Sequence, residues 1–134
     1  MRIPVLEDGP GAFTIALAMT RTVLIVDDHP SFRASARMLL ESEGFEVIGE
    51  AEDGSSALRA VEELHPDVAL LDVQLPDIDG IEVAARLSRN GSGPAIVLTS
   101  SRDLVDIGLV RERSPVRGFI PKAELSGAAL EALL

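Results

Sequence analysis

The chain of 134 residues contains no cysteine, tryptophan or tyrosine, so phenylalanine is its only aromatic residue. Without cysteine it can form no disulfide, thiolate nucleophile or zinc–thiolate site. Aromatic residues make up only 3% of the chain, which argues against a surface on which single-stranded bases stack. No apolar run is long enough to cross a bilayer, so we expect no membrane-spanning segment and no membrane partner.

Positive charge is also scarce, because 12 basic residues face 22 acidic ones and give a net charge of −10. That sign is wrong for a protein that grips a phosphate backbone, so we expect no direct nucleic-acid binding by this chain. The basic residues are almost all arginine, and Lys122 is the single lysine. The length and the balance of 46% hydrophobic and 25% charged residues are typical of one globular domain.

Residues 1–20 differ from the rest of the chain, with two prolines, two glycines and a short apolar run over Ala12–Met19. A signal peptide is one interpretation of that run, but only Arg2 supplies positive charge before it and no clear cleavage site follows. We favour a flexible N-terminal extension, with Met19 as an alternative start. The predicted domain then covers residues 21–134.

From residue 21 onward, short apolar runs alternate with segments of helical periodicity, which predicts a parallel sheet covered by helices on both faces. The runs predicted to be strands are Thr22–Val26, Phe45–Gly49, Val68–Leu71, Ala95–Thr99 and Val116–Ile120. Helices are predicted from Pro30 to about Gly44, over Ser55–Leu64, from Ile81 to Leu87, over Arg102–Arg113 and over Leu125–Leu134.

Polar residues follow these strands where a parallel sheet places its ligands, beyond the carboxyl ends. They are Asp27 and Asp28 after the first strand, Asp72 after the third, Thr99 at the end of the fourth and Lys122 after the fifth. Carboxylates that crowd together repel unless a cation neutralises them, and oxygen ligands favour a hard ion such as Mg²⁺. An ammonium and a hydroxyl nearby suit phosphoryl oxygens, and a carboxylate can itself attack phosphorus.

In this order and strand context, these residues resemble the receiver domain of two-component response regulators, over residues 21–134. The segments Val26–Arg33 (VDDHPSFR) and Gly118–Lys122 (GFIPK) are most similar to receivers of LuxR/NarL-type regulators, which usually carry a helix-turn-helix output domain. The resemblance implies a doubly wound five-stranded parallel sheet in the flavodoxin-like order 2-1-3-4-5, with helices on both faces. It also implies a cytoplasmic protein.

For the site, the resemblance implies that Asp72 accepts a phosphoryl group from a phosphohistidine on a histidine kinase or phosphotransfer protein. Asp28 and Asp72 would bind Mg²⁺ directly, together with the backbone carbonyl of Gln74. Asp27 would hold a water molecule bound to the metal. A strand-end cap is the alternative role for Asp72, and the N-cap of the helix at Pro30 is the alternative for Asp28.

The resemblance also implies a conformational switch. Thr99 and Lys122 would contact the phosphoryl group, and Phe119 occupies a position whose side chain often follows phosphorylation in relatives. A core role is the alternative that we favour for Phe119, while a plain strand residue and a solvated surface residue are the less favoured alternatives for Thr99 and Lys122. The fourth helix, fifth strand and fifth helix would carry the response, and homodimer formation stays open.

Two features depart from the family pattern. Ala123 follows Lys122 where relatives often have a proline with a cis bond, while Pro121 precedes it, which leaves the geometry of this segment open. Before the fifth strand, Arg113–Val116 replaces the usual small residues, which leaves the output surface open.

Other polar residues receive structural interpretations. Neither His29 nor His65 has a partner at ligand spacing, and we favour structural roles for both. Asp77 and Asp79 are interpreted as a turn residue and a helix N-cap.

The function favoured by the sequence is therefore a phosphorylation-controlled switch, not an enzyme acting on an external substrate. It would act through protein contacts or through a DNA-binding domain absent from this chain. One alternative is a receiver-like binding scaffold that is never phosphorylated. A phosphatase with an aspartate nucleophile is less favoured, because Gln74 stands where such enzymes need a second acid.

Overall fold

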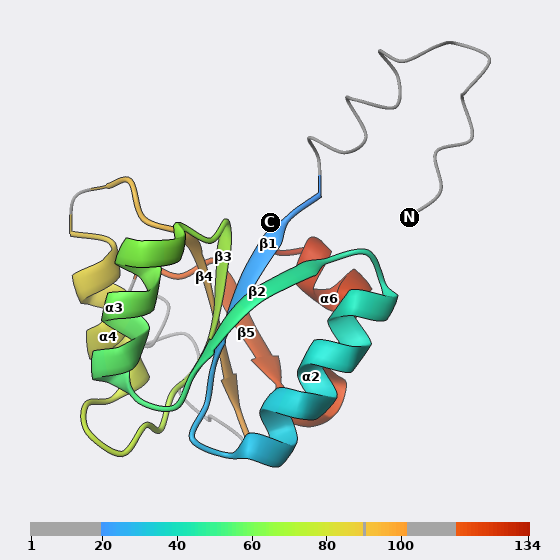
Figure 1. Ribbon diagram of the computed structural model, residues 1–134, viewed down its shortest axis with the longest axis horizontal. Helices are drawn as coiled ribbons and strands as arrows, with labels where there is room; N and C mark the ends of the chain where they lie inside the picture. The colour runs from blue at the N-terminus through green and yellow to red at the C-terminus, as the bar shows by residue number, and fades with distance from the viewer. Residues whose placement is uncertain (1–19, 90, 102–114) are drawn as a thin grey trace, which may run out of the picture.

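Five parallel strands form one sheet in the order β2-β1-β3-β4-β5 (Figure 1). The computed structural model describes residues 20–89, 91–101 and 115–134. The strands are β1 (Thr22–Val26), β2 (Glu46–Ala51), β3 (Val68–Asp72), β4 (Ala95–Ser100) and β5 (Gly118–Pro121). The predicted doubly wound order is confirmed.

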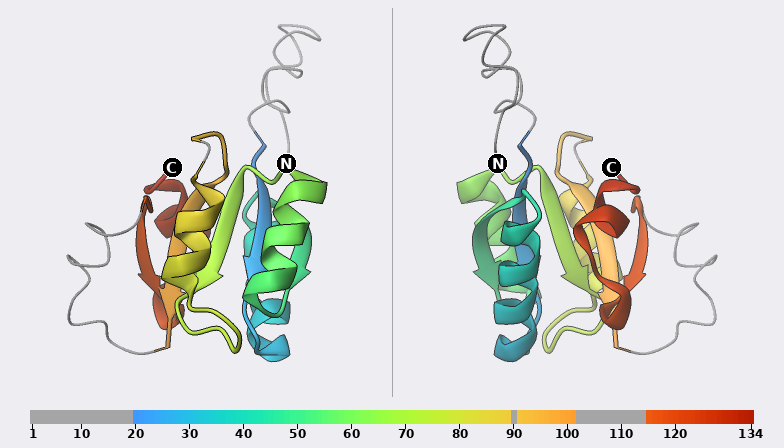
Figure 2. Two further views of the ribbon diagram at one scale, coloured as in Figure 1. Left: turned by 90° about the vertical axis from the view of Figure 1, so that its left-hand side faces the viewer. Right: turned by 90° about the vertical axis from the view of Figure 1, so that its right-hand side faces the viewer.

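Helices cover both faces of this sheet, as predicted (Figure 2). They are α2 (Pro30–Ser42), α3 (Gly54–Leu64), α4 (Gly80–Leu87), the 3-10 turn η2 (Lys122–Glu124) and α6 (Gly127–Glu131). One layer holds α2 and α6, and the other holds α3 and α4. No helix in the described ranges is long and apolar enough to cross a membrane.

The central strands β1, β3 and β4 are buried on both faces because, apart from a few polar residues at their ends, they carry apolar side chains at successive positions. In β1, Val23 and Ile25 pack in the cluster beneath α2 and α6, whereas Leu24 and Val26 pack beneath α3 and α4. Their alternation follows from the period of two residues in a strand. The core therefore consists of two layers, and the sheet edge between them is left for polar residues.

The C-terminal elements are shorter than predicted. β5 begins at Gly118 rather than Val116, and α6 covers Gly127–Glu131 rather than Leu125–Leu134. The physical reason for the later helix start is the Ser126 side chain, which accepts a hydrogen bond from the Ala129 N–H and caps α6. The residues before it form η2 instead.

Two expectations fall outside the described residues. They are the helix over Arg102–Arg113 and, except for Thr20, the extension over residues 1–20. The domain boundary at residue 21 stays a prediction.

Candidate functional site

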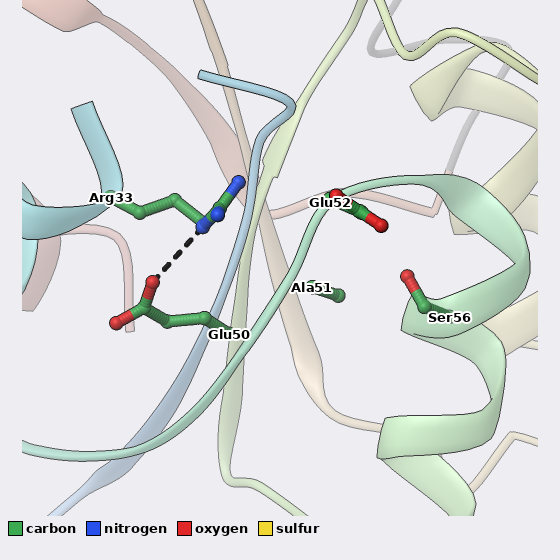
Figure 3. A pocket seen from close by; sticks show the side chains of 5 residues that line it. All are labelled: Arg33, Glu50, Ala51, Glu52 and Ser56. Carbon is green, nitrogen blue, oxygen red and sulfur yellow. Dashed lines mark hydrogen bonds and ion pairs between the residues drawn. The ribbon is translucent and has the colours of Figure 1, made fainter. Parts of the chain in front are cut away.

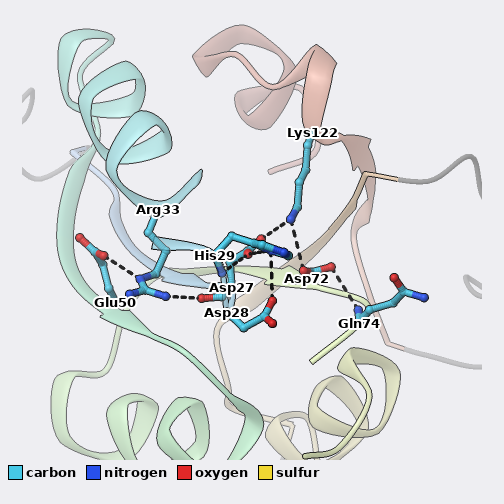
Figure 4. Close-up of polar contacts among 8 residues, drawn as sticks. All are labelled: Asp27, Asp28, His29, Arg33, Glu50, Asp72, Gln74 and Lys122. Carbon is cyan, nitrogen blue, oxygen red and sulfur yellow. Dashed lines mark hydrogen bonds and ion pairs between the residues drawn. The ribbon is translucent and has the colours of Figure 1, made fainter. Parts of the chain in front are cut away.

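Four predicted site residues lie at the carboxyl edge of the sheet, and Figure 4 shows three of them, Asp27, Asp72 and Lys122. Asp27 directly follows β1, Asp72 ends β3, Thr99 lies in β4 and Lys122 follows β5 at the start of η2. The parallel register brings them to one edge although almost a hundred residues separate the first from the last. Asp27, Asp72 and Thr99 are buried, at 0%, 3% and 1% exposure.

The Lys122 ammonium links the two buried carboxylates. Its Nζ lies 2.5 Å from Asp27 Oδ2 and 3.3 Å from Asp72 Oδ2. Burial would lower the pKa of Lys122, but the two carboxylates outweigh it and raise that pKa above its usual range. The Lys122 side chain is only 13% exposed, so the alternative of a solvated surface residue is wrong.

The two carboxylates respond differently to the same surroundings. Burial would raise the pKa of Asp27, but hydrogen bonds from Lys122 and His29 outweigh it and hold that pKa below its usual range. Burial and, less strongly, the charge of Asp27 raise the pKa of Asp72, against the hydrogen bonds from Gln74 and Lys122. Asp72 is thus the carboxylate whose charge is least compensated.

Asp28 and His29 complete a compact cluster of possible metal ligands. One ligand atom from each of Asp27, Asp28, His29 and Asp72 lies within 4.8 Å of the others. The His29 Nδ1 lies 2.9 Å from Asp27 Oδ1 and 3.1 Å from Asp28 Oδ1. The sequence spacing suggested that His29 has no partner, but in the structure it contacts two aspartates. Asp27, Asp28 and His29 are neighbours in the sequence, and no helical or strand periodicity indicates that their side chains meet. Only the conformation of the loop shows this contact.

The N-cap of α2 is His29, so the alternative role for Asp28 as N-cap is wrong. The His29 side chain makes no capping hydrogen bond at this helix end. His65 has the structural place expected of it, as the left-handed C-cap residue of α3.

The loop after β3 holds Asp72 from its own backbone. The Gln74 N–H donates to Asp72 Oδ1 at 3.1 Å, so one carboxylate oxygen does serve as a cap while the other faces Lys122. At the end of the loop, the Gly80 N–H donates to the Val73 carbonyl at 2.7 Å. A Cβ at Gly80 would lie 2.2 Å from the Asp72 carbonyl oxygen, so only glycine permits this close approach.

Asp77 anchors the same loop to the start of α3. Its carboxylate accepts hydrogen bonds from the N–H groups of Gly54 and Ser55, at 2.8 and 2.9 Å, and from the Ser55 hydroxyl. These bonds, led by those from the two backbone groups, hold the pKa of Asp77 well below its usual range. Asp77 is more than the turn residue predicted, whereas Asp79 caps α4 as predicted, through the Glu82 N–H.

Thr99 lies directly opposite Asp72 in the β3–β4 register. Its Oγ1 is buried and has no hydrogen-bond partner within the described part of the chain. A buried hydroxyl is costly to leave unpaired. The Thr99 hydroxyl, next to Asp72, is therefore suited to donate a hydrogen bond to an oxygen atom of a bound group. Phe119 pairs with Leu98 and packs, half buried, against the apolar cluster under α3 and α4. A core role thus fits Phe119, and its switching role stays a prediction.

The segment around Lys122 has no cis peptide bond, and none occurs elsewhere in the described residues. Pro121 ends the edge strand β5, where a missing N–H is tolerated, and Lys122 begins η2. From the first turn of α2, the Phe32 ring faces the ammonium, with its centroid 4.6 Å from Lys122 Nζ. No pattern in the sequence indicated that Phe32 contacts the site.

Arg33 supports the acidic edge from the side of β2. Its Nη1 donates to the Asp27 carbonyl at 2.5 Å and its Nε contacts Glu50 Oε1 at 2.9 Å. Arg33 and Glu50 also line a shallow pocket at this edge of the molecule, together with Ala51, Glu52 and Ser56 (Figure 3). The sequence singled out neither residue, because their contact depends on how α2 packs against β2.

The donor set fits a hard divalent cation. Three carboxylates converge at one sheet edge, and two of them are buried with a single ammonium to offset their charge. Mg²⁺ needs only one or two carboxylates and completes its coordination with water and phosphate oxygens. The Asp28 side chain is 38% exposed, which leaves it open to solvent and to an arriving ion.

Comparisons with known proteins agree with this geometry. A family model described as "Response regulator receiver domain" matches residues 23–132. The DNA-binding response regulator MtrA of Mycolicibacterium smegmatis is 44% identical over 93 residues, covering 68% of this chain and 40% of that protein. The transcriptional regulatory protein PdtaR of Mycobacterium tuberculosis is 40% identical over 91 residues, covering 66% and 44%. The chain thus spans less than half the length of these two relatives.

Solved structures give the same fold. The two-component response regulator of the LuxR family from Aurantimonas sp. SI85-9A1 superposes with a TM-score of 0.75 at 29% identity, covering 85% of each chain. CheX–CheY with BeF₃ and Mg²⁺, from Borrelia burgdorferi, contributes a chain with a TM-score of 0.76 at 23% identity, covering 89% of this chain and 90% of that one. At that identity, the second likeness concerns the fold alone.

Proposed function

The chain belongs to the response regulator receiver domain family of two-component signalling, and from this premise we propose that Asp72 is its phosphoryl acceptor. Members of this family are in general switches rather than enzymes that act on external substrates. The donor would be a phosphohistidine on a histidine kinase or phosphotransfer protein. The observation that carries the proposal is the pairing of a buried, undercompensated Asp72 with the Lys122 ammonium, 3.3 Å away.

The proposed transfer is a displacement at phosphorus. A carboxylate oxygen of Asp72 forms a bond to phosphorus while the bond between phosphorus and the donor's histidine nitrogen breaks. That nitrogen keeps the electron pair, and the imidazole leaves neutral when the other ring nitrogen of the phosphohistidine carries a proton. Lys122 would pair with a phosphoryl oxygen, and the buried Thr99 hydroxyl would donate to another; the ion pair of Lys122 with Asp72 and the unpaired Thr99 Oγ1 support these roles.

Mg²⁺ would supply charge neutralisation between the carboxylates and the phosphoryl group. The residues proposed to hold it are Asp28, Asp72 and the backbone carbonyl of Gln74, with Asp27 acting through a water molecule. The convergence of the carboxylates within 4.8 Å supports this set. His29 lies in the same cluster, where it contacts both aspartates that follow β1.

The proposed output is a change of surface that follows phosphorylation. Thr99 would move toward the new phosphoryl oxygens, and Phe119, the β5 register partner of the preceding residue Leu98, would change its packing against the α3–α4 side. The full-length relatives named above include a DNA-binding regulator, so we also propose that the complete protein acts through contacts of this domain or through a DNA-binding part. We propose a cytoplasmic location, which fits partner kinases that act there, and a homodimer as a further state to test.

The deciding experiment is the intact mass of the protein after incubation with Mg²⁺ and a small acyl phosphate. We expect wild type to gain the mass of one phosphoryl group, and Asp72→Asn to gain none. The matched control is Asp67→Asn, which alters an aspartate at the opposite end of the same strand, where it accepts hydrogen bonds from Thr22. The control should gain the group as wild type does.

A protein that takes up no phosphoryl group is then titrated with beryllofluoride and Mg²⁺ and followed by NMR. Shifts at Thr99 and Lys122 would indicate a competent acceptor that needs its own kinase. Absence of both phosphoryl uptake and beryllofluoride binding would contradict the proposal and favour a scaffold that is never phosphorylated.

A further inference from the structure

The aromatic ring of Phe32 and the ammonium of Lys122 approach from different elements at the acidic edge. Lys122 begins η2 after the edge strand β5, whereas Phe32 lies in the first turn of α2. The Nζ atom lies 4.6 Å from the ring centroid, within the range of a cation–π interaction. The same Nζ contacts Asp27 and Asp72, so the ammonium has one aromatic and two carboxylate neighbours.

We propose that Phe32 is a positioning residue that holds the Lys122 ammonium over the acidic pair, ready for a phosphoryl group on Asp72. The second half of this statement rests on the proposed function, whereas the contact itself does not. Phe32 would not touch the phosphoryl group. It would act only through the lysine.

The need for such a residue follows from the flexibility of lysine. The lysine ammonium lies at the end of a side chain with four rotatable bonds, and holding that side chain in one conformation costs conformational entropy. The carboxylates attract the ammonium from one side. Their negative charge decreases, however, when Asp72 forms a bond to phosphorus and when the metal neutralises the remaining carboxylate. A ring face on another side keeps its attraction in both states, because its quadrupole does not change on phosphorylation.

The ring is itself held in place by the rest of the site. Phe32 packs, half buried, against the apolar cluster between the sheet and the helices α2 and α6. The next residue, Arg33, donates to the Asp27 carbonyl at 2.5 Å. The helix turn that presents the ring is therefore bonded to the loop that presents the acid, and the lysine is positioned relative to both.

The composition of the chain makes this contact directly measurable. Lys122 is the only lysine, so protein labelled with ¹³C-lysine gives one Cε signal in an NMR spectrum. In wild type, without Mg²⁺ or phosphate donor, we expect the attached protons to be shifted upfield by the ring current. Phe32→Leu should return them toward the position in an unfolded chain, and Phe32→Tyr should retain the shift.

The matched control is Phe45→Leu, which removes a ring from the same apolar cluster without touching the lysine. Phe45 is buried at 8% exposure and lies after α2, directly before β2. It should lower thermal stability, since it truncates a core ring, but leave the Lys122 signal in place. A general loosening of the core would instead move the signal in both leucine variants.

The functional readout is the rate of phosphoryl uptake from an acyl phosphate with Mg²⁺. We expect Phe32→Leu to slow uptake about fivefold, in line with a partly desolvated cation–π contact, and Phe32→Tyr and Phe45→Leu to stay close to wild type. Equal slowing in both leucine variants would overturn the positioning role. So would an unshifted Lys122 signal in wild type.

The two proposals fail in distinguishable ways. A ring-current shift that depends on Phe32, in a protein that takes up no phosphoryl group and binds no beryllofluoride, supports the contact and contradicts the proposed function. Normal uptake in Phe32→Leu supports the proposed function and overturns the positioning role.

Discussion

Asp72 and Thr99 are register partners at the carboxyl end of the β3–β4 ladder. The next backbone bond, from the Val73 N–H to the Thr99 carbonyl at 3.0 Å, extends this pairing one step further. The backbones of Asp72 and Thr99 are thus separated by one interstrand spacing, about 5 Å.

This relationship predicts opposite effects of Thr99→Val on stability and on signalling. Valine keeps the shape of threonine and removes a buried hydroxyl that has no partner within the described ranges, so we expect the free energy of unfolding to rise by about 1 kcal/mol. Phosphorylation, or beryllofluoride binding, should become weaker. Urea denaturation and a beryllofluoride titration measure the two quantities, and Thr99→Ser, which keeps the hydroxyl, is the control. A stability loss in Thr99→Val would contradict this account.

Asp72→Asn should stabilise the protein at neutral pH in the absence of Mg²⁺. The pKa of Asp72 is raised in the folded state, so its ionisation opposes folding as the pH rises through that raised value. Below the unfolded value of 3.8 both forms are protonated and the effect vanishes. We expect a gain in the free energy of unfolding at pH 7.5 that shrinks toward pH 4.

Thermal melts of wild type and Asp72→Asn over this pH range test the sign. Added Mg²⁺ should reduce the difference, because it favours the ionised wild type. A gain that grows as the pH falls would contradict the assignment of Asp72 as the undercompensated charge.

Lys122→Met should destabilise the protein by about 3 kcal/mol without Mg²⁺, since it leaves two buried carboxylates without their cation. Mg²⁺ should restore part of this loss by neutralising the same groups. Urea denaturation with and without Mg²⁺ measures both effects. The control is Arg117→Met, whose guanidinium bonds the exposed Leu134 carbonyl and should show no dependence on Mg²⁺. Equal Mg²⁺ dependence in the two variants would contradict a local effect.

Asp77→Ala should weaken Mg²⁺ binding although Asp77 does not belong to the predicted ligand set. Its carboxylate fixes the loop that carries Gln74 by bonding the N–H groups of Gly54 and Ser55. Loss of such an outer support typically lowers metal affinity on the order of tenfold. Isothermal titration calorimetry is suited to this measurement, since the chain has no tryptophan or tyrosine to report by fluorescence. Asp67→Ala, at the other end of β3, should leave the affinity unchanged.

Local patterns in the sequence predicted a parallel sheet and the location of the site, whereas the strand order was implied by the resemblance to receiver domains. A buried apolar run followed by an acid identifies Asp27 and Asp72, and parallel strands bring such positions together whatever the loops do. The contacts of His29 and Phe32 were not predictable in this way. They depend on the turn between β1 and α2 and on side-chain packing across the sheet, which no periodicity encodes.

The same limit applies to Asp77. Its residue type indicated a turn, but its partners at Gly54 and Ser55 lie more than 20 residues earlier in the chain. The length of α6 was overestimated for a different reason. The apolar pattern begins before the helix does, because the Ser126 cap and the preceding 3-10 turn fix where α6 starts.

Two glycines have a consequence for how this domain can evolve. A methyl group at Gly80 would collide with the Asp72 carbonyl, and one at Gly54 would collide with the Ile78 side chain of the same loop. In a saturation mutagenesis experiment, both positions would therefore tolerate as little variation as the acids, although neither contributes an atom to the chemistry. Descendants of this sequence can therefore retain the site only if they also retain a residue without a side chain at positions 54 and 80.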